Sequence, residues 1–180
     1  MQTDVLIVGA GPVGLALAIE LGMRGVRCIV VEQHDRVGVA PRAKTTNVRT
    51  REHLRRWGIA GQLAAAAPMG VDYPSNVVFA TRLKDGFELC RFENNSFSKP
   101  GKNPLYSEHG QWIPQYILEE VMKAHAESLP GVEIRFGSRL NEFKQDGERV
   151  RTRIGSETIE SKYLVGADGS RSTVRELIGA

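Results

Sequence analysis

Hydrophobic and polar positions form their clearest pattern near the N-terminus. The run Val5–Val8 is wholly apolar, as is typical of a buried parallel strand, and a glycine-rich turn follows at Gly9–Gly14. Apolar residues then recur at helical spacing over Val13–Met23, and Arg27–Val31 is a second apolar run. A strand, a helix and a strand in this order predict a right-handed parallel βαβ unit.

The middle of the chain changes character twice. Gln33–Lys44 is polar and contains glycine and proline, which predicts a loop, and either Thr45 or Thr46 is suited to cap a helix through "NVRTREHLRRW". Ala60–Ala67 continues as a weakly patterned helix. Pro68–Trp112 is richer in Pro, Gly and Asn and holds short β-like runs. We therefore expect the first part of a second, strand-containing domain there.

The last third of the chain returns to regular elements. Pro114 suits the first turn of a helix through "QYILEEVMKAHAES", which has an apolar stripe. Several short strands are expected after it: Glu133–Phe136, Leu140–Lys144, Arg149–Ile154, Glu157–Ser161 and Tyr163–Val165. The pattern predicts an α/β fold, with a Rossmann-like domain in 1–67 and 113–180 and an incomplete second domain in 68–112. Its parallel sheet carries the βαβ unit and additional antiparallel strands.

Composition and charge narrow the function classes. The 180 residues are 41% hydrophobic and 25% charged, with a net charge of +3, as in ordinary globular α/β proteins. Basic and acidic residues are interspersed, so the charge does not indicate a nucleic-acid partner. One predicted helix is rich in arginine but also holds Glu52, which favours a solvated face over a polyanion site; its arginines are Arg49, Arg51, Arg55 and Arg56.

Cysteine usage and hydropathy indicate the compartment. Cys28 and Cys90 fit neither a metal-ligand spacing nor a CxxC pair, and the histidines show no ligand spacing, so no metal site is expected. No apolar run reaches the roughly 18–20 residues of a membrane span. Glycines, rather than a cleavage site, follow the first apolar run. We expect a cytoplasmic chain without a membrane partner.

The turn after the first strand carries the first candidate chemistry. Gly9, Gly11 and Gly14 form the spacing GxGxxG between a strand and a helix. The first glycine permits the tight turn, the second lets the backbone approach a pyrophosphate, and the third lets helix and strand pack closely. Glu32 follows the second strand, where its carboxylate can accept hydrogen bonds from a ribose 2′-hydroxyl. The site therefore favours FAD or NAD over NADP.

A second turn of related form lies at the end of the chain. Asp168 and Gly169 follow an apolar strand and precede a short helical stretch. In that place a carboxylate and backbone amides can face the same crevice as the glycine turn. The alternative is structural, with Asp168 capping the helix that follows.

Four motifs in order resemble one enzyme family. They are "VLIVGAGPVGLALAIELGMRGVRCIVVEQ", "PRAKTTNVRTREHLRRWGI", "WIPQYILEEV" and "GADGSRSTVRELIG". They resemble the class A flavoprotein monooxygenases, which include para-hydroxybenzoate hydroxylase and phenol and polyketide hydroxylases. The resemblance covers essentially the whole chain, most weakly between Pro68 and Trp112. It implies that the Rossmann-like domain binds FAD and that 68–112 begins a substrate domain.

The resemblance also assigns residues to the cofactor. Gly9, Gly11, Gly14 and Glu32 would hold the ADP half of FAD, and Asp168 would lie near the pyrophosphate and the approach of nicotinamide. Arg42 would lie near the flavin and its phosphates, and Gln115 would also contact FAD. A solvated loop arginine and a polar residue at a helix start are the structural alternatives for Arg42 and Gln115.

The implied activity is hydroxylation of a small, phenol-like aromatic substrate. In the family, NAD(P)H reduces FAD, O₂ adds to the reduced flavin, and a flavin hydroperoxide delivers oxygen to the ring. No residue of this sequence stands out as an acid, a base or a nucleophile, so no catalytic residue is assigned.

Family members continue well beyond the Asp-Gly motif. They add most of the substrate-binding sheet and a Gly-Asp motif that meets the flavin. We therefore expect this chain to be the N-terminal FAD-binding part of such an enzyme, with a complementing C-terminal half or a second copy as a partner. Two alternatives stay open: a non-catalytic dinucleotide-binding fragment or split-enzyme half, and a related FAD-dependent epoxidase, halogenase or dehydrogenase.

Overall fold

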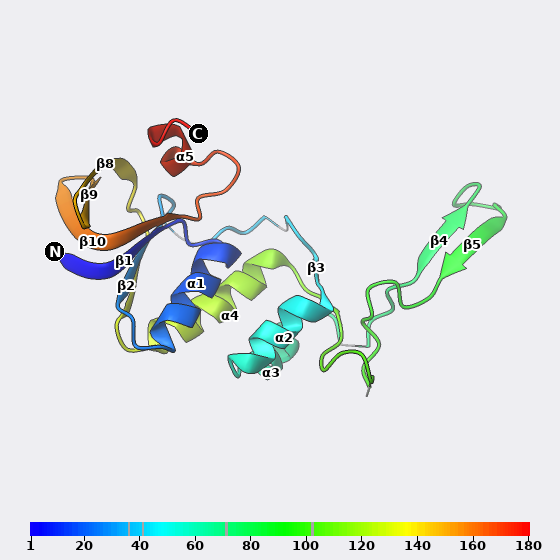
Figure 1. The fold of residues 1–180 in the computed structure, drawn as a ribbon. Coiled ribbons are helices and arrows are strands. Elements are labelled where there is room, and N and C mark those ends of the chain that lie inside the picture. Colours follow the sequence, from blue (N-terminus) through cyan, green and yellow to red (C-terminus); the bar gives the residue numbers. More distant parts are fainter. Residues whose placement is uncertain (36, 41, 71, 102) are drawn as a thin grey trace. The chain divides into compact units, whose positions relative to one another are not determined.

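The computed structural model describes residues 1–35, 37–40, 42–70, 72–101 and 103–180. The chain packs into two compact units, one formed by Met1–Val39 with Glu119–Ala180 and the other by Ala40–Leu118 (Figure 1). The strands of the first unit are β1 (Gln2–Val8), β2 (Cys28–Val31), β7 (Val132–Arg135), β8 (Leu140–Asp146), β9 (Arg149–Ile154) and β10 (Glu157–Gly166). Its helices are α1 (Pro12–Gly22) and α5 (Thr173–Leu177). Helix α4 (Gln115–Ser128) begins in the second unit and ends in the first.

One mixed sheet organises the first unit. Its strand order is β7-β2-β1-β10-β9-β8. The first four strands run parallel, β9 pairs antiparallel with β10, and β8 pairs antiparallel with β9. The expected α/β class, with a βαβ unit and added antiparallel strands, is confirmed. Because both faces of β1 are covered, the apolar run Val5–Val8 is buried throughout.

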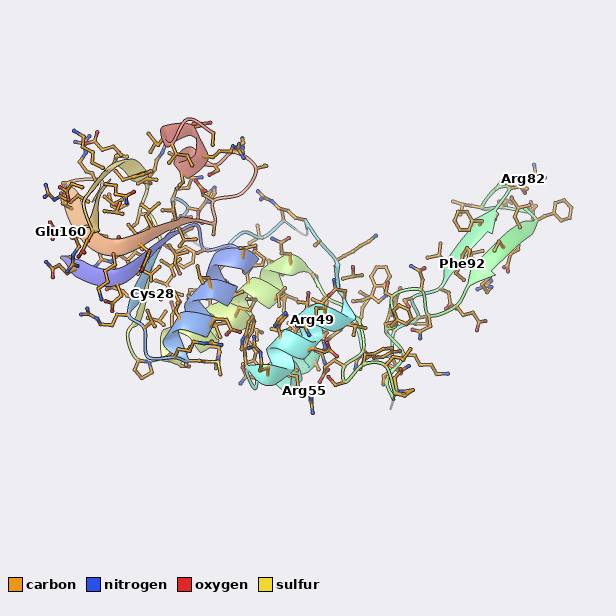
Figure 2. The ribbon with its side chains drawn as sticks, in the orientation of Figure 1. Cys28, Arg49, Arg55, Arg82, Phe92 and Glu160 are labelled. Carbon is orange, nitrogen blue, oxygen red and sulfur yellow. The ribbon has the colours of Figure 1, made fainter. Side chains whose placement is uncertain are left out.

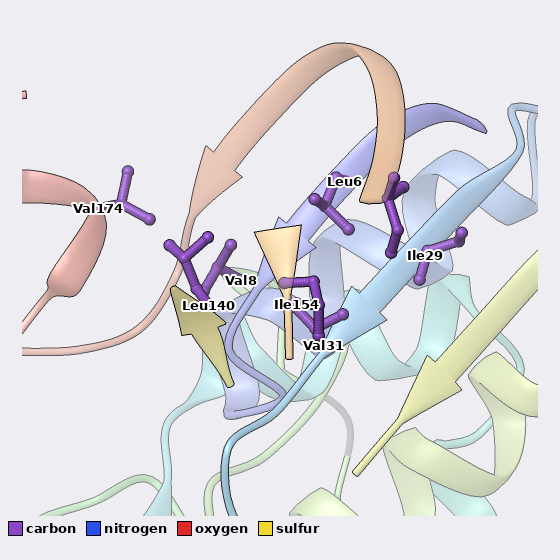
Figure 3. Close-up of a cluster of buried hydrophobic side chains, with 8 residues drawn as sticks. Leu6, Val8, Ile29, Val31, Leu140, Ile154 and Val174 are labelled. Atoms are coloured by element: carbon purple, nitrogen blue, oxygen red, sulfur yellow. The ribbon is translucent and has the colours of Figure 1, made fainter. Parts of the chain in front are cut away.

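The two faces of β1 pack against different elements. Ile7 lies close to Gly14 of α1, so this helix covers one face. Leu6 and Val8 point to the opposite face, where they join a cluster with Val174 of α5 (Figure 3). The other buried members of this cluster are Ile29, Val31, Leu140, Ile154 and Ile159. The antiparallel strands and α5 thus supply the second apolar layer.

The end of the sheet differs from the expected strand pattern. Glu157–Ser161 and Tyr163–Val165 were expected as separate strands, but β10 runs through both without a break. Its residues pair with β1 on either side of Lys162, whose ammonium lies 3.0 Å from the Asp4 carboxylate. Continuous pairing with β1 keeps this polar position in the strand.

The second unit is built on two short helices and two small strand pairs. Helices α2 (Val48–Arg56) and α3 (Ala60–Ala66) pack together. Strand β3 (Thr45–Thr46) pairs antiparallel with β6 (Gln111–Trp112), and β4 (Val77–Ala80) pairs with β5 (Glu88–Phe92).

The expected helix cap at Thr45 or Thr46 is wrong. Both threonines belong to β3, and the side chain of Asn47 instead accepts a hydrogen bond from Thr50 N at 2.8 Å. An asparagine is as good a cap as a threonine. The partner strand β6, which sequence reasoning did not find, decides that the threonines are extended.

The expected solvated face of α2 is correct for some arginines and wrong for one. Arg49 and Arg55, both labelled in Figure 2, have side chains 74% and 63% exposed. Arg51 is only 3% exposed, because it lies on the side of α2 that faces α3 and β6.

The hairpin β4–β5 is exposed along both strands. It falls within 68–112, the segment expected to begin a second domain. The compact units divide the chain at other positions than that expected division. Packing alone does not identify which segments bind a cofactor, so the division into 1–67 with 113–180 and 68–112 stays a prediction.

Candidate functional site: a glycine turn, two carboxylates and a strand pair

The three glycines of the first turn have different surroundings. Gly9 has φ +106°, and a Cβ there would lie 2.5 Å from Ala167 O. A Cβ on Gly14 would lie 1.9 Å from Gly9 O. A Cβ on Gly11 would meet no atom within 4 Å. Gly9 and Gly14 are therefore required by the fold itself, whereas Gly11 leaves open space in front of the backbone.

Helix α1 begins at this open space. Gly11 is its N-cap and makes no side-chain capping bond, and Pro12 occupies the first turn. In contrast, side chains of Asn47 and Ser172 cap α2 and α5. Among the described residues, no side chain caps the first N–H groups of α1, and these groups carry the positive end of the helix dipole. This arrangement suits a phosphate group.

Glu32 lies at the end of β2 and contacts the glycine turn. Its Oε2 accepts a hydrogen bond from Ala10 N at 3.0 Å. Its Oε1 accepts one from His34 N at 3.0 Å and lies 2.6 Å from His34 Nδ1. The side chain is 15% exposed, and Oε2 keeps a second acceptor position for a hydroxyl.

The charge state of Glu32 follows from these contacts. Burial raises the pKa of the carboxyl, but the hydrogen bonds from His34 and Ala10 outweigh it, so the pKa of Glu32 lies below its ordinary value. The group is therefore an anion at neutral pH and can accept a hydrogen bond from a hydroxyl. His34 is a contact that sequence reasoning missed; its position two residues after the carboxylate was the available signal.

Asp168 lies next to the glycine turn through its backbone. A Cβ on Gly9 would be 3.0 Å from Asp168 Cα, and Ala167 N donates to Val8 O at 2.7 Å. The two glycine-containing turns, far apart in sequence, are therefore adjacent in this unit. They meet because β1 and β10 are neighbouring parallel strands that end at the same edge.

The Asp168 carboxylate caps helix α5. Its Oδ1 accepts from Ser172 Oγ at 2.6 Å, and its Oδ2 accepts from Val174 N at 3.1 Å. Burial raises the pKa of Asp168, but the Ser172 hydroxyl and backbone N–H groups lower it further, and the net pKa is below its ordinary value. The structural alternative considered for Asp168, a helix cap, is thus observed.

Arg42 and Gln115 lie in the second unit. Backbone hydrogen bonds that continue the β3–β6 pair join their two segments. Gln115 N donates to Ala43 O at 2.8 Å, directly after Arg42. Arg42 is exposed and Gln115 is half-buried. The predicted site residues therefore form two groups: Gly9, Gly11, Gly14, Glu32 and Asp168 in the first unit, and Arg42 with Gln115 in the second.

The first group fits the ADP part of a dinucleotide. The turn offers free space at Gly11, uncapped N–H groups at the start of α1, and an anionic acceptor at the end of the next strand. Within the described part of the chain, no cluster of three or more His, Cys, Asp or Glu side chains is arranged to hold a metal ion. No helix among the described residues is long and apolar enough to cross a membrane.

Fold and site together define a dinucleotide-binding α/β domain of the Rossmann type. Comparison with known proteins then gives the family. The chain belongs to the FAD binding domain family, which matches residues 2–180.

The relatives are monooxygenases by name. The chain is 34% identical over 179 residues to rifampicin monooxygenase of Rhodococcus hoagii, covering 98% of this chain and 33% of that protein. It is 37% identical over 180 residues to 6-methylpretetramide 4-monooxygenase of Streptomyces rimosus, covering 98% and 30%. The flavin-dependent monooxygenase PieE, solved with FAD and substrate, matches with a TM-score of 0.84 and 31% identity, covering 99% and 32%.

These matches confirm the resemblance to aromatic and polyketide monooxygenases. They also set its extent, because the chain spans about a third of the length of the relatives it matches.

Proposed function

We propose that this chain is the FAD-binding part of an NAD(P)H-dependent monooxygenase that hydroxylates a phenol-like aromatic substrate. The observation that carries the proposal is the open turn at Gly11, bounded by the uncapped start of α1 and by the Glu32 carboxylate. The names of the relatives support the reaction class.

In this proposal each predicted residue has a distinct task. Backbone N–H groups at Gly11 and the start of α1 bind the pyrophosphate, and Glu32 accepts a hydrogen bond from the ribose. Gly9 and Gly14 hold the turn in shape. The task of Asp168 is to fix the second turn beside Gly9, near the pyrophosphate and the approach of nicotinamide.

Arg42 and Gln115 are proposed to contact the flavin and its phosphates. Their ladder contact supports a joint role, because the Gln115 amide is bonded to the residue directly after Arg42. Bound FAD supplies the redox chemistry, namely reduction by NAD(P)H and oxygen transfer from O₂; the flavin hydroperoxide route is part of the proposal. The protein residues bind and orient the cofactor.

The first test is a visible absorbance titration of the purified chain with FAD. Perturbed flavin bands and saturation at one FAD per chain are the expected result. Oxidation of NADH and NADPH is then followed with phenols, both for the chain alone and with the polypeptide that follows this region in a relative. A folded chain that leaves the free-flavin spectrum unchanged at high FAD concentration would contradict the cofactor proposal.

A second candidate function is favoured by the exposed β4–β5 hairpin. Its apolar side chains lie in solvent, which suits a non-catalytic dinucleotide-binding module or one half of a split enzyme. In that case FAD binds, but NAD(P)H oxidation needs a second polypeptide or a second copy.

Buried Cys28 and exposed Cys90 are both free thiols, which supports a reducing, cytoplasmic location.

A further inference from the structure

The arginine-rich helix α2 contains a buried arginine, Arg51, that is not among the residues of the proposed cofactor site. Arg51 is 3% exposed, and its guanidinium makes three polar contacts. Its Nη1 donates to Gln111 Oε1 at 2.6 Å and to Ala60 O at 3.0 Å, and its Nη2 donates to Glu108 Oε2 at 3.0 Å. One side chain therefore ties α2 to the start of α3 and to strand β6.

Gln111 is the central partner of this arginine. It is 1% exposed and belongs to β6, where it pairs with Thr46 of β3. The Thr46 hydroxyl also donates to Gln111 O at 3.3 Å. Arg51 thus bonds the side chain of a residue that takes part in the β3–β6 pair.

The same ladder continues to the two predicted flavin contacts. Beyond the strand pair, Ile113 N donates to Lys44 O at 2.9 Å and Gln115 N donates to Ala43 O at 2.8 Å. The Lys44 ammonium also lies 5.5 Å from the centre of the Trp112 ring. The segments that hold Arg42 and Gln115 are therefore joined as continuations of the two chain segments that form the β3–β6 pair.

The buried guanidinium is not explained by stability alone. Arg51 Nε and Gln111 Nε2 are buried without a hydrogen-bond partner among the described residues. A buried charge that is incompletely bonded is seldom more stabilising than apolar side chains of the same size. Its planar guanidinium, however, holds several acceptors in one rigid geometry, whereas the three donors of a lysine ammonium rotate freely.

We propose that Arg51 is a positioning residue for the cofactor site. It holds Gln111 and thereby strand β6, so that Gln115 and Arg42 are presented side by side. This inference rests on the proposed function, since it gives those two residues their role toward FAD. Arg51 itself acts through Gln111 and needs no contact with the cofactor.

The test compares Arg51→Met with Arg51→Lys and with Arg49→Met, a matched control on the exposed side of the same helix. The first measurement needs no cofactor: amide hydrogen exchange of Ile113 and Gln115 in the FAD-free chain. We expect exchange at these amides to become about tenfold faster in Arg51→Met, with sheet amides such as Ile7 unchanged. The exchange rates of Arg49→Met should equal those of wild type. The rates of Arg51→Lys should remain close to those of Arg51→Met.

The second measurement is FAD affinity at a temperature where every variant is folded. We expect the dissociation constant to rise about tenfold in Arg51→Met and less than about twofold in Arg49→Met. Gln111→Leu leaves Arg51 paired with Glu108 but removes the link to β6. It should therefore show both the faster amide exchange and the weaker FAD binding. It replaces Arg51→Met if that variant does not fold.

The outcomes separate this inference from the proposed function. If the folded Arg51→Met and Gln111→Leu variants bind FAD as tightly as wild type does, the positioning role of Arg51 is wrong. The proposed cofactor site is not affected by that result. Unchanged exchange at Ile113 and Gln115 overturns the positioning role as well. A wild-type chain that does not bind FAD overturns the proposed cofactor site, and the positioning role with it, whatever the exchange rates show.

Discussion

Gly11 differs from its two companion glycines in what a side chain would meet. Gly9 needs its positive φ, and Gly14 lies against the carbonyl oxygen of Gly9. At Gly11 the backbone is ordinary, with φ −74°, and the space in front of it is open. The fold needs the first and third glycines, whereas in our proposal the second is needed by the ligand.

This difference gives a prediction for single alanine variants. Gly14→Ala should destabilise the chain by about 1–3 kcal/mol, because its Cβ overlaps backbone that cannot move freely. Gly11→Ala should cost about 0.5–1 kcal/mol as a poorer N-cap, yet weaken FAD binding about tenfold or more. Urea unfolding and FAD titration measure the two effects separately.

The control is Gly61→Ala, because Gly61 lies in α3 and also has free space around its Cβ position. It should leave FAD affinity unchanged. Equal FAD affinity in Gly11→Ala and wild type would show that no phosphate approaches this turn.

At the scale of elements, helix α5 depends on its first turn. The helix has five residues, too few to be stable on its own, and it is held by two caps and by Val174 in the apolar cluster. Ser172 Oγ accepts from Arg175 N, and the Asp168 carboxylate accepts from both Ser172 and Val174. The carboxylate thereby joins the second turn to the helix.

Asp168→Asn should cost about 1 kcal/mol of unfolding free energy at neutral pH, with an upper limit near 2 kcal/mol. The pKa of Asp168 is lower in the folded chain than its ordinary value of about 4. The contribution of the Asp168 carboxylate to the free energy of unfolding is therefore complete at pH values above its ordinary pKa. This contribution is lost as the pH falls through the pKa of the folded chain. Urea unfolding of both proteins between about pH 7 and pH 3 tests this.

The difference in stability between wild type and Asp168→Asn should shrink toward the acid end. Ser172→Ala serves as the control, because it removes a neutral cap and should show a difference with weaker pH dependence. A gap between wild type and Asp168→Asn that does not change with pH would mean that the carboxylate charge is not what holds the turn.

At the scale of the whole molecule, the main irregularity is the exposed hairpin β4–β5 and its connection. Large apolar side chains lie in solvent there: Val78, Phe79, Leu83, Phe87, Leu89 and Phe92. Exposed apolar side chains gathered on one hairpin favour association with another surface. The chain also spans only about a third of its relatives.

We predict that the double variant Phe87→Ser and Leu89→Ser binds less hydrophobic fluorescent dye and elutes as a smaller species in size-exclusion chromatography. Both side chains are exposed, so the unfolding free energy should change by about 0.5 kcal/mol or less. Leu105→Ser removes an exposed leucine outside the hairpin and is the control. A monodisperse wild-type monomer that binds no dye would contradict the prediction.

The predictions from sequence were most accurate where local patterns suffice. The apolar run Val5–Val8, the glycine spacing and the position of Glu32 predicted the βαβ unit, and the strand order places them as expected. They failed where a distant partner decides. Thr45 and Thr46 are extended because β6 pairs with them, and Lys162 continues β10 because β1 does.

The sequence by itself determined the α/β class, the family and the chemical types at the first turn, because these depend on periodicity and on residues close together in the chain. The tertiary structure alone decided the contacts of Arg51, the cap made by Asp168 and the meeting of the two turns. The first and the last depend on which side of an element faces another element distant in sequence, whereas the Asp168 cap is local and was one of the two alternatives that the sequence left open. In the sequence, Arg49 and Arg51 both lie among polar residues of the same helix. The packing of α3 and β6 against one side of that helix buries Arg51 and leaves Arg49 exposed.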